Sequence, residues 1–211
     1  MIFSSITYEC NIENLLLMTK RLCVDKKKRI AVALDVDNTL VYTSEEEIAD
    51  YDFTINSASQ TQYFVKLRPG LKRFLNFCQK NCQVFIYSAA NIEYIHEILK
   101  GIFSKLYSSN SDKIEIKRIF SRNDCFQLID WHDKIIYKKD LNRLQCKHAY
   151  LIDDLPESFF DRQKANGILI KPYFGDDENE NEFERIIEII NSKIDNICHQ
   201  SLYQLTSLKA K

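Results

Sequence analysis

The sequence has little glycine and proline, and neither sign of charge is in excess. Only 4 glycines and 3 prolines occur among 211 residues, which excludes collagen-like and Gly/Pro-rich low-complexity chains. Hydrophobic residues make up 45%, enough for the core of one domain or at most two small ones. The 29 Lys+Arg against 30 Asp+Glu give a formal net charge of −1. This near-neutrality argues against a whole-molecule binder of nucleic acid or of a membrane surface.

The chain also lacks long apolar runs and paired cysteine motifs. No run approaches the roughly 18 apolar residues that a transmembrane helix needs, and the first residues do not follow a signal-peptide pattern. The 7 cysteines are odd in number and form no CxxC, which is typical of reduced thiols. We therefore expect an intracellular protein with no membrane partner. Residues 26–29 (KKKR) are either a nuclear localisation signal or a solvated segment before a strand, so the sequence does not decide between nucleus and cytoplasm.

Apolar patterning predicts strands that alternate with helices. Continuous apolar runs indicate buried strands at 29–35, 83–87, 148–152 and 168–171. Helical spacing of apolar residues occurs at 71–78, 92–99 and 182–197. Further short elements are expected at 12–23 and 140–144 (helices), within 51–67 (a hairpin), and at 114–120 and 134–137 (strands).

This alternation favours an α/β fold, a Rossmann-like parallel sheet with helices on both faces. The hairpin region is a small β insertion, and no segment is long enough for a large cap. We divide the chain into an N-terminal extension with a short helix (1–28), the α/β domain (29–197) and a C-terminal tail (198–211).

Polar residues follow three of the predicted strands, where ligands bind in such sheets. They are Asp35 and Asp37, Ser88, and the pair Asp153-Asp154. Asp35 and Asp37 are two residues apart, so in an extended chain they lean to the same side, roughly 6–7 Å apart. One such carboxylate can act as a nucleophile while the other carries a proton.

The charge of this set favours a cation and a phosphoryl substrate. A third carboxylate nearby would be repelled unless a cation neutralised it, and Mg²⁺ binds carboxylates, carbonyls, water and phosphate. A Lys from the pair 138–139 and the Ser88 hydroxyl would then contact phosphoryl oxygens. The pattern indicates phosphoryl transfer through an aspartyl phosphate.

The motifs also resemble a known family. LDVDNTLVYTS (34–44) resembles the DxDxT signature of the haloacid-dehalogenase superfamily, and most closely the branch that dephosphorylates the C-terminal domain of RNA polymerase II, the NLI-interacting-factor family. The family's other segments follow in the same order, namely KLRPGLKRFL (66–75), VFIYSAANIEYIHEIL (84–99), IFSRNDCF (119–126), YKKDLNRL (137–144) and LIDDLPESF (151–159).

The resemblance implies a role for each matched residue. Asp35 would be the nucleophile, Asp37 the general acid and base, and Lys139 the motif lysine, with Lys138 as the competing candidate. Thr39 would hydrogen-bond the phosphate or the loop. Ser88 and Arg122 would bind phosphate, although Arg122 has a surface ion pair as its alternative. Mg²⁺ would be held by Asp35, the carbonyl of Asp37, and Asp153, with Asp154 assisting.

The chain departs from the family at residues 123–138, which are a few residues longer than in small members. Trp131 lies in this insertion and would either contact a substrate or pack. Peptide specificity is therefore the least transferable property.

The resemblance implies a Mg²⁺-dependent phosphoserine/phosphothreonine protein phosphatase, and the polymerase tail is one candidate substrate. A missing cap suits a phosphoprotein better than a metabolite. We expect a monomer without direct nucleic-acid binding. The alternatives are a non-catalytic adaptor of the same fold, similar to an import-translocase subunit, and a phosphatase for a small metabolite or a nucleic-acid end.

Overall fold

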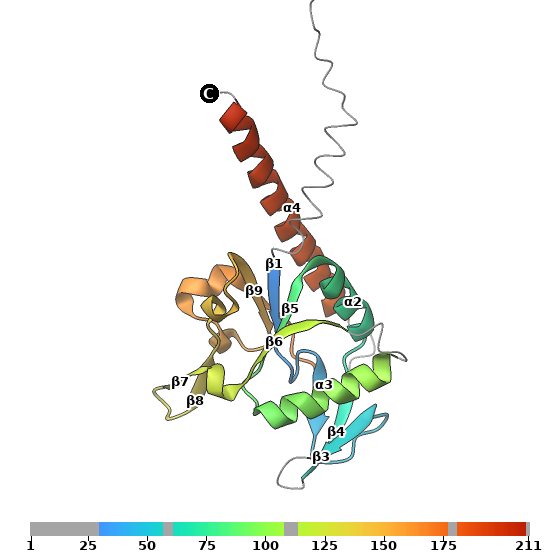
Figure 1. Cartoon of the computed structure of the whole chain (residues 1–211). Helices are drawn as coiled ribbons and strands as arrows, with labels where there is room; N and C mark the ends of the chain where they lie inside the picture. The colour runs from blue at the N-terminus through green and yellow to red at the C-terminus, as the bar shows by residue number, and fades with distance from the viewer. Residues whose placement is uncertain (1–29, 57–60, 108–113, 177–180, 210–211) are drawn as a thin grey trace, which may run out of the picture.

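The computed structural model describes residues 30–56, 61–107, 114–176 and 181–209. The helix predicted within 12–23 lies outside the described residues. At the centre is a five-stranded parallel sheet with the order β10-β9-β1-β5-β6 (Figure 1). Its strands are β1 (Ile30–Leu34), β5 (Gln83–Tyr87), β6 (Ile116–Phe120), β9 (His148–Asp153) and β10 (Gly167–Leu169).

The register of this sheet brings three strand ends together. Leu34 at the end of β1 is paired with Ile86 of β5 on one side and with Ile152 of β9 on the other. All five residues of β1 are buried, as expected for an apolar strand in the middle of a parallel sheet. The residues that directly follow β1, β5 and β9 therefore meet at one edge.

The two faces of the sheet are covered differently. Side chains of α2 (Leu71–Asn81), α3 (Ile92–Leu106) and α4 (Glu182–Lys209) form one large core cluster with alternate residues of the sheet. The other face packs against Leu141 and Leu144 of the short 3-10 helix η3 (Leu141–Leu144) and against Phe159, which follows the 3-10 helix η4 (Pro156–Ser158). The sheet is covered on both faces as predicted, but all three α-helices belong to one core cluster.

Two small antiparallel sheets complete the described fold. The insertion between β1 and α2 is a three-stranded sheet with the order β2-β4-β3, formed by β2 (Val41–Ser44), β3 (Phe53–Asn56) and β4 (Gln62–Leu67). The predicted hairpin corresponds to β3 and β4, and β2 is an additional strand. The second sheet is a hairpin of β7 (Phe126–Ile129) and β8 (Ile135–Lys138), which projects from the body (Figure 1).

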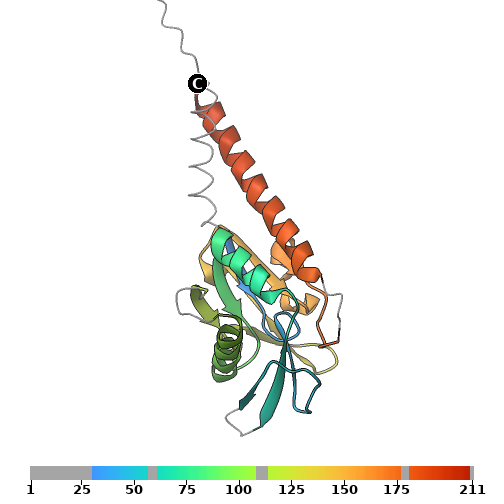
Figure 2. The same ribbon diagram turned by 90° about the vertical axis from the view of Figure 1, so that its right-hand side faces the viewer.

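Helix α4 runs on to Lys209, so it continues through residues that we assigned to a tail, and it extends away from the sheet (Figure 2). Its buried side chains stop at Ile194 in the part whose side chains are described. Among the described helices, none combines the length and the apolar character needed to cross a membrane. The described cysteines are free thiols, and burial raises the pKa of Cys82 to about 12.

Candidate active site

The loop after β1 presents two carboxylates at the sheet edge. The backbone N–H of Asp35 extends the parallel ladder by donating to the Ile152 carbonyl at 3.0 Å. The chain then turns, because the Val36 carbonyl accepts from the N–H groups of Leu40 and Val41. Asn38 adopts a left-handed conformation in this turn, with a φ of 54°, which asparagine tolerates better than most residues.

Arg68 holds this loop from behind. Its buried guanidinium donates to the Thr39 carbonyl at 3.1 Å and to the Asn38 carbonyl at 3.3 Å. The same group donates to the Lys171 carbonyl at 2.5 Å. A charged donor shared among buried carbonyls satisfies backbone groups that a turn leaves without helix or sheet partners. Arg68 therefore ties the Asp35–Asp37 loop to the segment after β10.

Lys139 lies between two carboxylates. Its ammonium is 2.5 Å from Asp35 Oδ1 and 2.5 Å from Asp153 Oδ2, and the side chain is buried. Burial lowers the pKa of Lys139, but the negative charges of Asp153 and Asp35 outweigh burial and raise it. Lys139 is thus a permanent cation in the site. Lys138, the competing candidate, instead donates to the carbonyls of Glu157 and Phe159.

Three carboxylates gather around this lysine. Oxygens of Asp35, Asp153 and Asp154 all lie within 4.8 Å of one another and are buried, a cluster able to hold a metal ion. Burial raises the pKa of Asp35, and the charge of Asp153 raises it further, whereas Lys139 lowers it. Burial and Asp153 also raise the pKa of Asp154 to about 6. One lysine therefore does not balance the negative charge of the cluster.

Thr39 and Asp37 each form side-chain hydrogen bonds beside this cluster. Thr39 is fully buried, and its hydroxyl donates to Asp154 Oδ1 at 3.4 Å. It does not line the cavity, so the structure gives no support to its predicted contact with phosphate. The Asp37 carboxylate lies outside the three-carboxylate cluster. It accepts from the Tyr94 hydroxyl at 2.5 Å and from the Thr43 hydroxyl at 3.4 Å.

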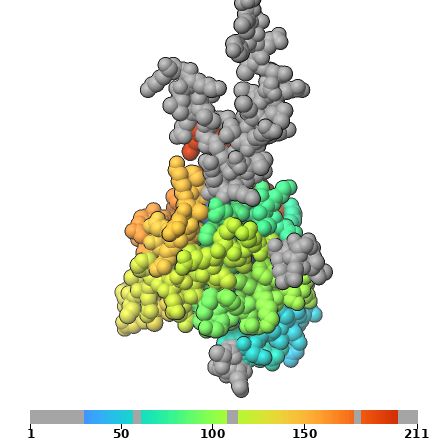
Figure 3. Space-filling model, viewed as in Figure 1, coloured from blue at the N-terminus to red at the C-terminus, as the bar shows by residue number. Residues whose placement is uncertain are grey.

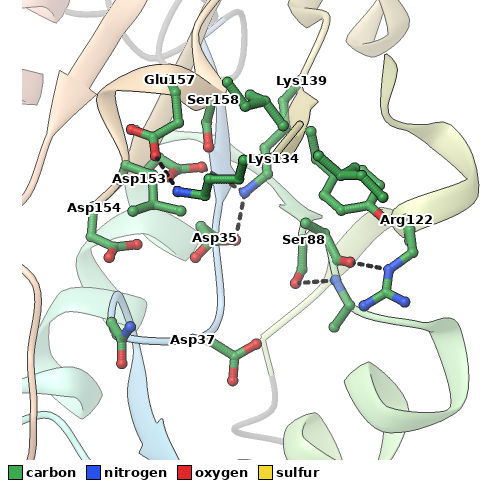
Figure 4. Close-up of a pocket in the computed structure, with 17 residues that line it drawn as sticks. Asp35, Asp37, Ser88, Arg122, Lys134, Lys139, Asp153, Asp154, Glu157 and Ser158 are labelled. Atoms are coloured by element: carbon green, nitrogen blue, oxygen red, sulfur yellow. Dashed lines mark hydrogen bonds and ion pairs between the residues drawn. The ribbon is translucent and has the colours of Figure 1, made fainter. Parts of the chain in front are cut away.

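A cavity of about 310 Å³ joins these groups (Figure 4). Ser88 lines it and accepts the N–H of Ala90 at 3.1 Å through its hydroxyl oxygen. Arg122 lies on the same side, where its Nε donates to the Ala89 carbonyl at 2.7 Å. Its guanidinium is 5.5 Å from the centre of the Tyr137 ring, a stacking geometry typical of arginine.

Lys134 and Glu157 stand at the rim of the cavity, and their charged groups are 3.7 Å apart. The structure thus places all the predicted residues except Thr39 on one cavity, and Asp37 there is separate from the acidic cluster.

Sequence reasoning missed Tyr94, Arg68 and Lys134. A signal for Tyr94 was present, because it lies in the first turn of α3, directly after the carboxyl end of β5. Asn91 caps that turn by accepting the Tyr94 N–H at 2.8 Å. Arg68 also lies in a segment that resembles the family, KLRPGLKRFL (66–75), but its role depends on contacts with distant carbonyls. Lys134 carries no comparable signal.

Comparison with known proteins shows the family of the chain. The family model described as NLI interacting factor-like phosphatase matches residues 30–200. The chain belongs to this family. Its central parallel sheet, covered on both faces, is the haloacid-dehalogenase-like fold that the motifs predict.

Two similar proteins have names that describe them as CTD phosphatase-like. CTD small phosphatase-like protein 2 of Dictyostelium discoideum is 30% identical over 169 residues, which are 78% of this chain and 27% of that protein. The CTD phosphatase-like protein 355R of Invertebrate iridescent virus 6 is 27% identical over 76% of this chain and 96% of its own length. The chain thus spans about a quarter of the Dictyostelium relative.

The solved structure of Fcp1, an essential RNA polymerase II CTD phosphatase, superposes with a TM-score of 0.61. At 17% identity, covering 88% of this chain and 67% of that one, the superposition shows a shared fold. Because the chain belongs to a phosphatase family, the cavity at the sheet edge is its candidate active site.

Proposed function

We propose that the chain is a Mg²⁺-dependent phosphoserine/phosphothreonine protein phosphatase that forms an aspartyl phosphate on Asp35. The observation that carries the proposal is the buried Asp35–Lys139–Asp153 arrangement with Asp37 two residues away. Asp35 lies beside a fixed cation, so its ionised carboxylate can act as the nucleophile. Asp37 accepts hydrogen bonds from neutral donors and can carry the proton at the same place.

The acidic cluster fits a hard divalent cation. Three buried carboxylates share one ammonium, and the pKa values of Asp35 and Asp154 are raised by burial. Oxygen donors alone make up the cluster, as Mg²⁺ prefers. Asp35, Asp153 and Asp154 would hold the ion, and the carbonyl of Asp37 remains the predicted fourth protein ligand. The ion would neutralise charge on the cluster and on the phosphoryl oxygens.

The residues then divide the reaction between them. The Asp35 carboxylate attacks phosphorus, and the bond from phosphorus to the serine or threonine oxygen breaks. Asp37 gives its proton to the departing oxygen, then takes a proton from the water that hydrolyses the aspartyl phosphate and releases phosphate. Lys139 supports the ionised form of Asp35, while Ser88 and Arg122 bind phosphoryl oxygens in this scheme.

The open site supports a protein substrate. Between β1 and α2, the described residues contribute only the short strands of the β2-β4-β3 sheet, and no second domain covers the cavity in the described part of the chain. A phosphorylated side chain on a polypeptide can enter such a site. Two relatives are named CTD phosphatase-like proteins, and Fcp1 is an RNA polymerase II CTD phosphatase, so this C-terminal domain is the first substrate to test.

The decisive experiment substitutes the nucleophile. We expect Asp35→Asn to lower kcat/KM on aryl phosphate and on phosphoserine peptides by at least roughly a thousandfold, because the substitution removes the carboxylate that forms the acyl phosphate in this scheme. Asp161→Asn is the matched control, because Asp161 is exposed and pairs only with Lys164. EDTA should abolish turnover, and added Mg²⁺ should restore it.

The same panel includes phosphorylated oligonucleotides and sugar phosphates, which test the alternative substrates. Preferred turnover of either would contradict the protein-phosphatase assignment. A purified, folded wild-type chain with no turnover on any substrate would favour the non-catalytic adaptor. Wild-type activity in Asp35→Asn would remove the nucleophile assignment.

A further inference from the structure

The β7–β8 hairpin carries most of the exposed large apolar side chains in the described part of the chain. Five of the nine such residues lie within its thirteen residues. They are Phe126, Leu128, Ile129, Trp131 and Ile135. All four residues of β7 are exposed. Exposed apolar groups gathered in one place are typical of a binding surface.

The tip of this hairpin is an ordered turn. The Asp130 carboxylate accepts the N–H groups of His132 and Lys134, each at 2.8 Å. The Asp130 N–H donates to the Lys134 carbonyl at 2.9 Å. Trp131, at 87% exposed, is therefore held out by a hydrogen-bonded turn. An ordered turn presents an apolar side chain at a low entropic cost for binding.

The apolar surface is continuous with the active-site cavity. Ile135 and Tyr137 line the cavity, and they lie on the same face of β8 because they are two residues apart. Ile129 is paired directly opposite Ile135, so it extends this face away from the cavity. Trp131 continues the strip to the tip of the hairpin, and the hairpin segment forms a corner of the molecule (Figure 3).

We propose that the apolar strip, formed by Ile129, Trp131 and Ile135, binds apolar side chains of the phosphoprotein substrate on one side of its phosphorylated residue. The inference rests on the proposed function. At about 3.3 Å per residue, an extended peptide that leaves the cavity past Tyr137 would reach Ile129 and Ile135 after roughly two residues, and Trp131 after roughly four.

Chemistry and geometry favour a peptide as the occupant. Asp130 and Asp133 flank Trp131 at the tip, and anionic lipid headgroups would repel these carboxylates. In the described residues β7 and β8 pair only with each other, so an extended peptide also finds unpaired main-chain groups along the hairpin. The cavity at the inner end of the strip supplies the phosphate site that the same peptide needs.

The test compares hairpin variants on matched peptides. We would prepare Ile129→Ser combined with Trp131→Ala, with Phe174→Ala as a control. Phe174 is also exposed but does not line the active-site cavity. The substrates are phosphoserine peptides with leucine or phenylalanine two and four residues from phosphoserine, in either direction. The same peptides with glutamine at those positions, and p-nitrophenyl phosphate, complete the set.

We expect the double variant to lose about tenfold or more in kcat/KM on the apolar peptides of one direction. Its turnover of the glutamine peptides and of p-nitrophenyl phosphate should stay within about twofold of wild type, as should all activities of the control. Circular dichroism and Tm verify that both variants fold.

Equal losses on apolar and glutamine peptides, or no loss at all, would overturn the inference while leaving the phosphatase assignment intact. The double variant could instead lose lipid-vesicle binding or self-association while its activity on peptides is unchanged. That result would assign the strip to another partner and would also overturn the inference. A wild-type enzyme that hydrolyses p-nitrophenyl phosphate but no phosphopeptide would refute the proposed function and the strip together.

Discussion

Tyr94→Phe tests whether the Tyr94 hydroxyl positions the proton carrier. This hydroxyl donates to Asp37 Oδ1 at 2.5 Å and lies 3.1 Å from the Thr43 hydroxyl. Burial and the negative charge of Asp37 raise the pKa of Tyr94 above its ordinary value, so the phenol stays protonated and remains a donor. The substitution removes one oxygen and keeps the ring in place.

The size of the effect follows from the bond that is lost. A hydrogen bond to a charged group contributes about 1.5–3 kcal/mol. If Asp37 needs that bond to protonate the leaving group, the substitution removes this much stabilisation from the transition state. At about 1.4 kcal/mol per tenfold, kcat/KM on a poor leaving group such as phenyl phosphate should fall by about 10- to 150-fold. A 2,4-dinitrophenyl ester leaves without a proton, so its kcat/KM should change by less than about threefold.

The assay measures kcat/KM for a series of aryl phosphates of increasing leaving-group pKa. A plot of log kcat/KM against the leaving-group pKa should have a steeper negative slope for Tyr94→Phe than for wild type. Tyr63→Phe is the matched control, because its hydroxyl contacts Glu45 at 3.3 Å, while its ring lies edge-on to Tyr94. Equal losses on the phenyl and dinitrophenyl esters, or no loss on either, would refute the reasoning.

Three further variants test the scaffold and the acidic cluster. Arg68→Met should lower the free energy of unfolding by about 3 kcal/mol in urea titrations, because three carbonyls lose a charged donor. Asp140→Ala should lower it by about 1–3 kcal/mol at pH 7. Hydrogen bonds and Arg162 outweigh burial and lower the pKa of Asp140, so this difference should vanish as pH falls through that pKa. Mg²⁺ should raise the Tm of wild type and raise that of Asp154→Asn less.

The placement of the charged residues could be predicted because it depends on one regular feature. Apolar runs that end at Asp35, Ser88 and Asp153 indicate parallel strands, and the carboxyl ends of parallel strands lie at the same edge of the sheet. The order of residues along the chain therefore gives the edge at which they meet. The structure has that register, with Leu34 between Ile86 and Ile152.

Contacts that depend on side-chain direction across distant segments could not be predicted. The run at 134–137 has the composition of a sheet strand, yet β8 pairs with the neighbouring β7 because a turn closed by Asp130 joins them. Thr39 follows the acidic motif closely, but its hydroxyl turns inward to Asp154. The short helix expected at 140–144 corresponds to η3, but its packing on the second sheet face was not predicted, because so short a segment shows no helical period that would indicate a buried side.

The different surroundings of Asp35 and Asp37 explain how two carboxyl groups so close in sequence can take opposite roles. Burial raises the pKa of both. Asp35, however, faces the Lys139 ammonium and the acidic cluster that fits a cation, and each positive charge there favours its ionised form. Asp37 lies outside that cluster and has neutral hydroxyls as its nearest donors. In the proposed mechanism, a cation held by the cluster would lower the pKa of Asp35 more than that of the more distant Asp37, which fits Asp35 as the nucleophile and Asp37 as the proton carrier.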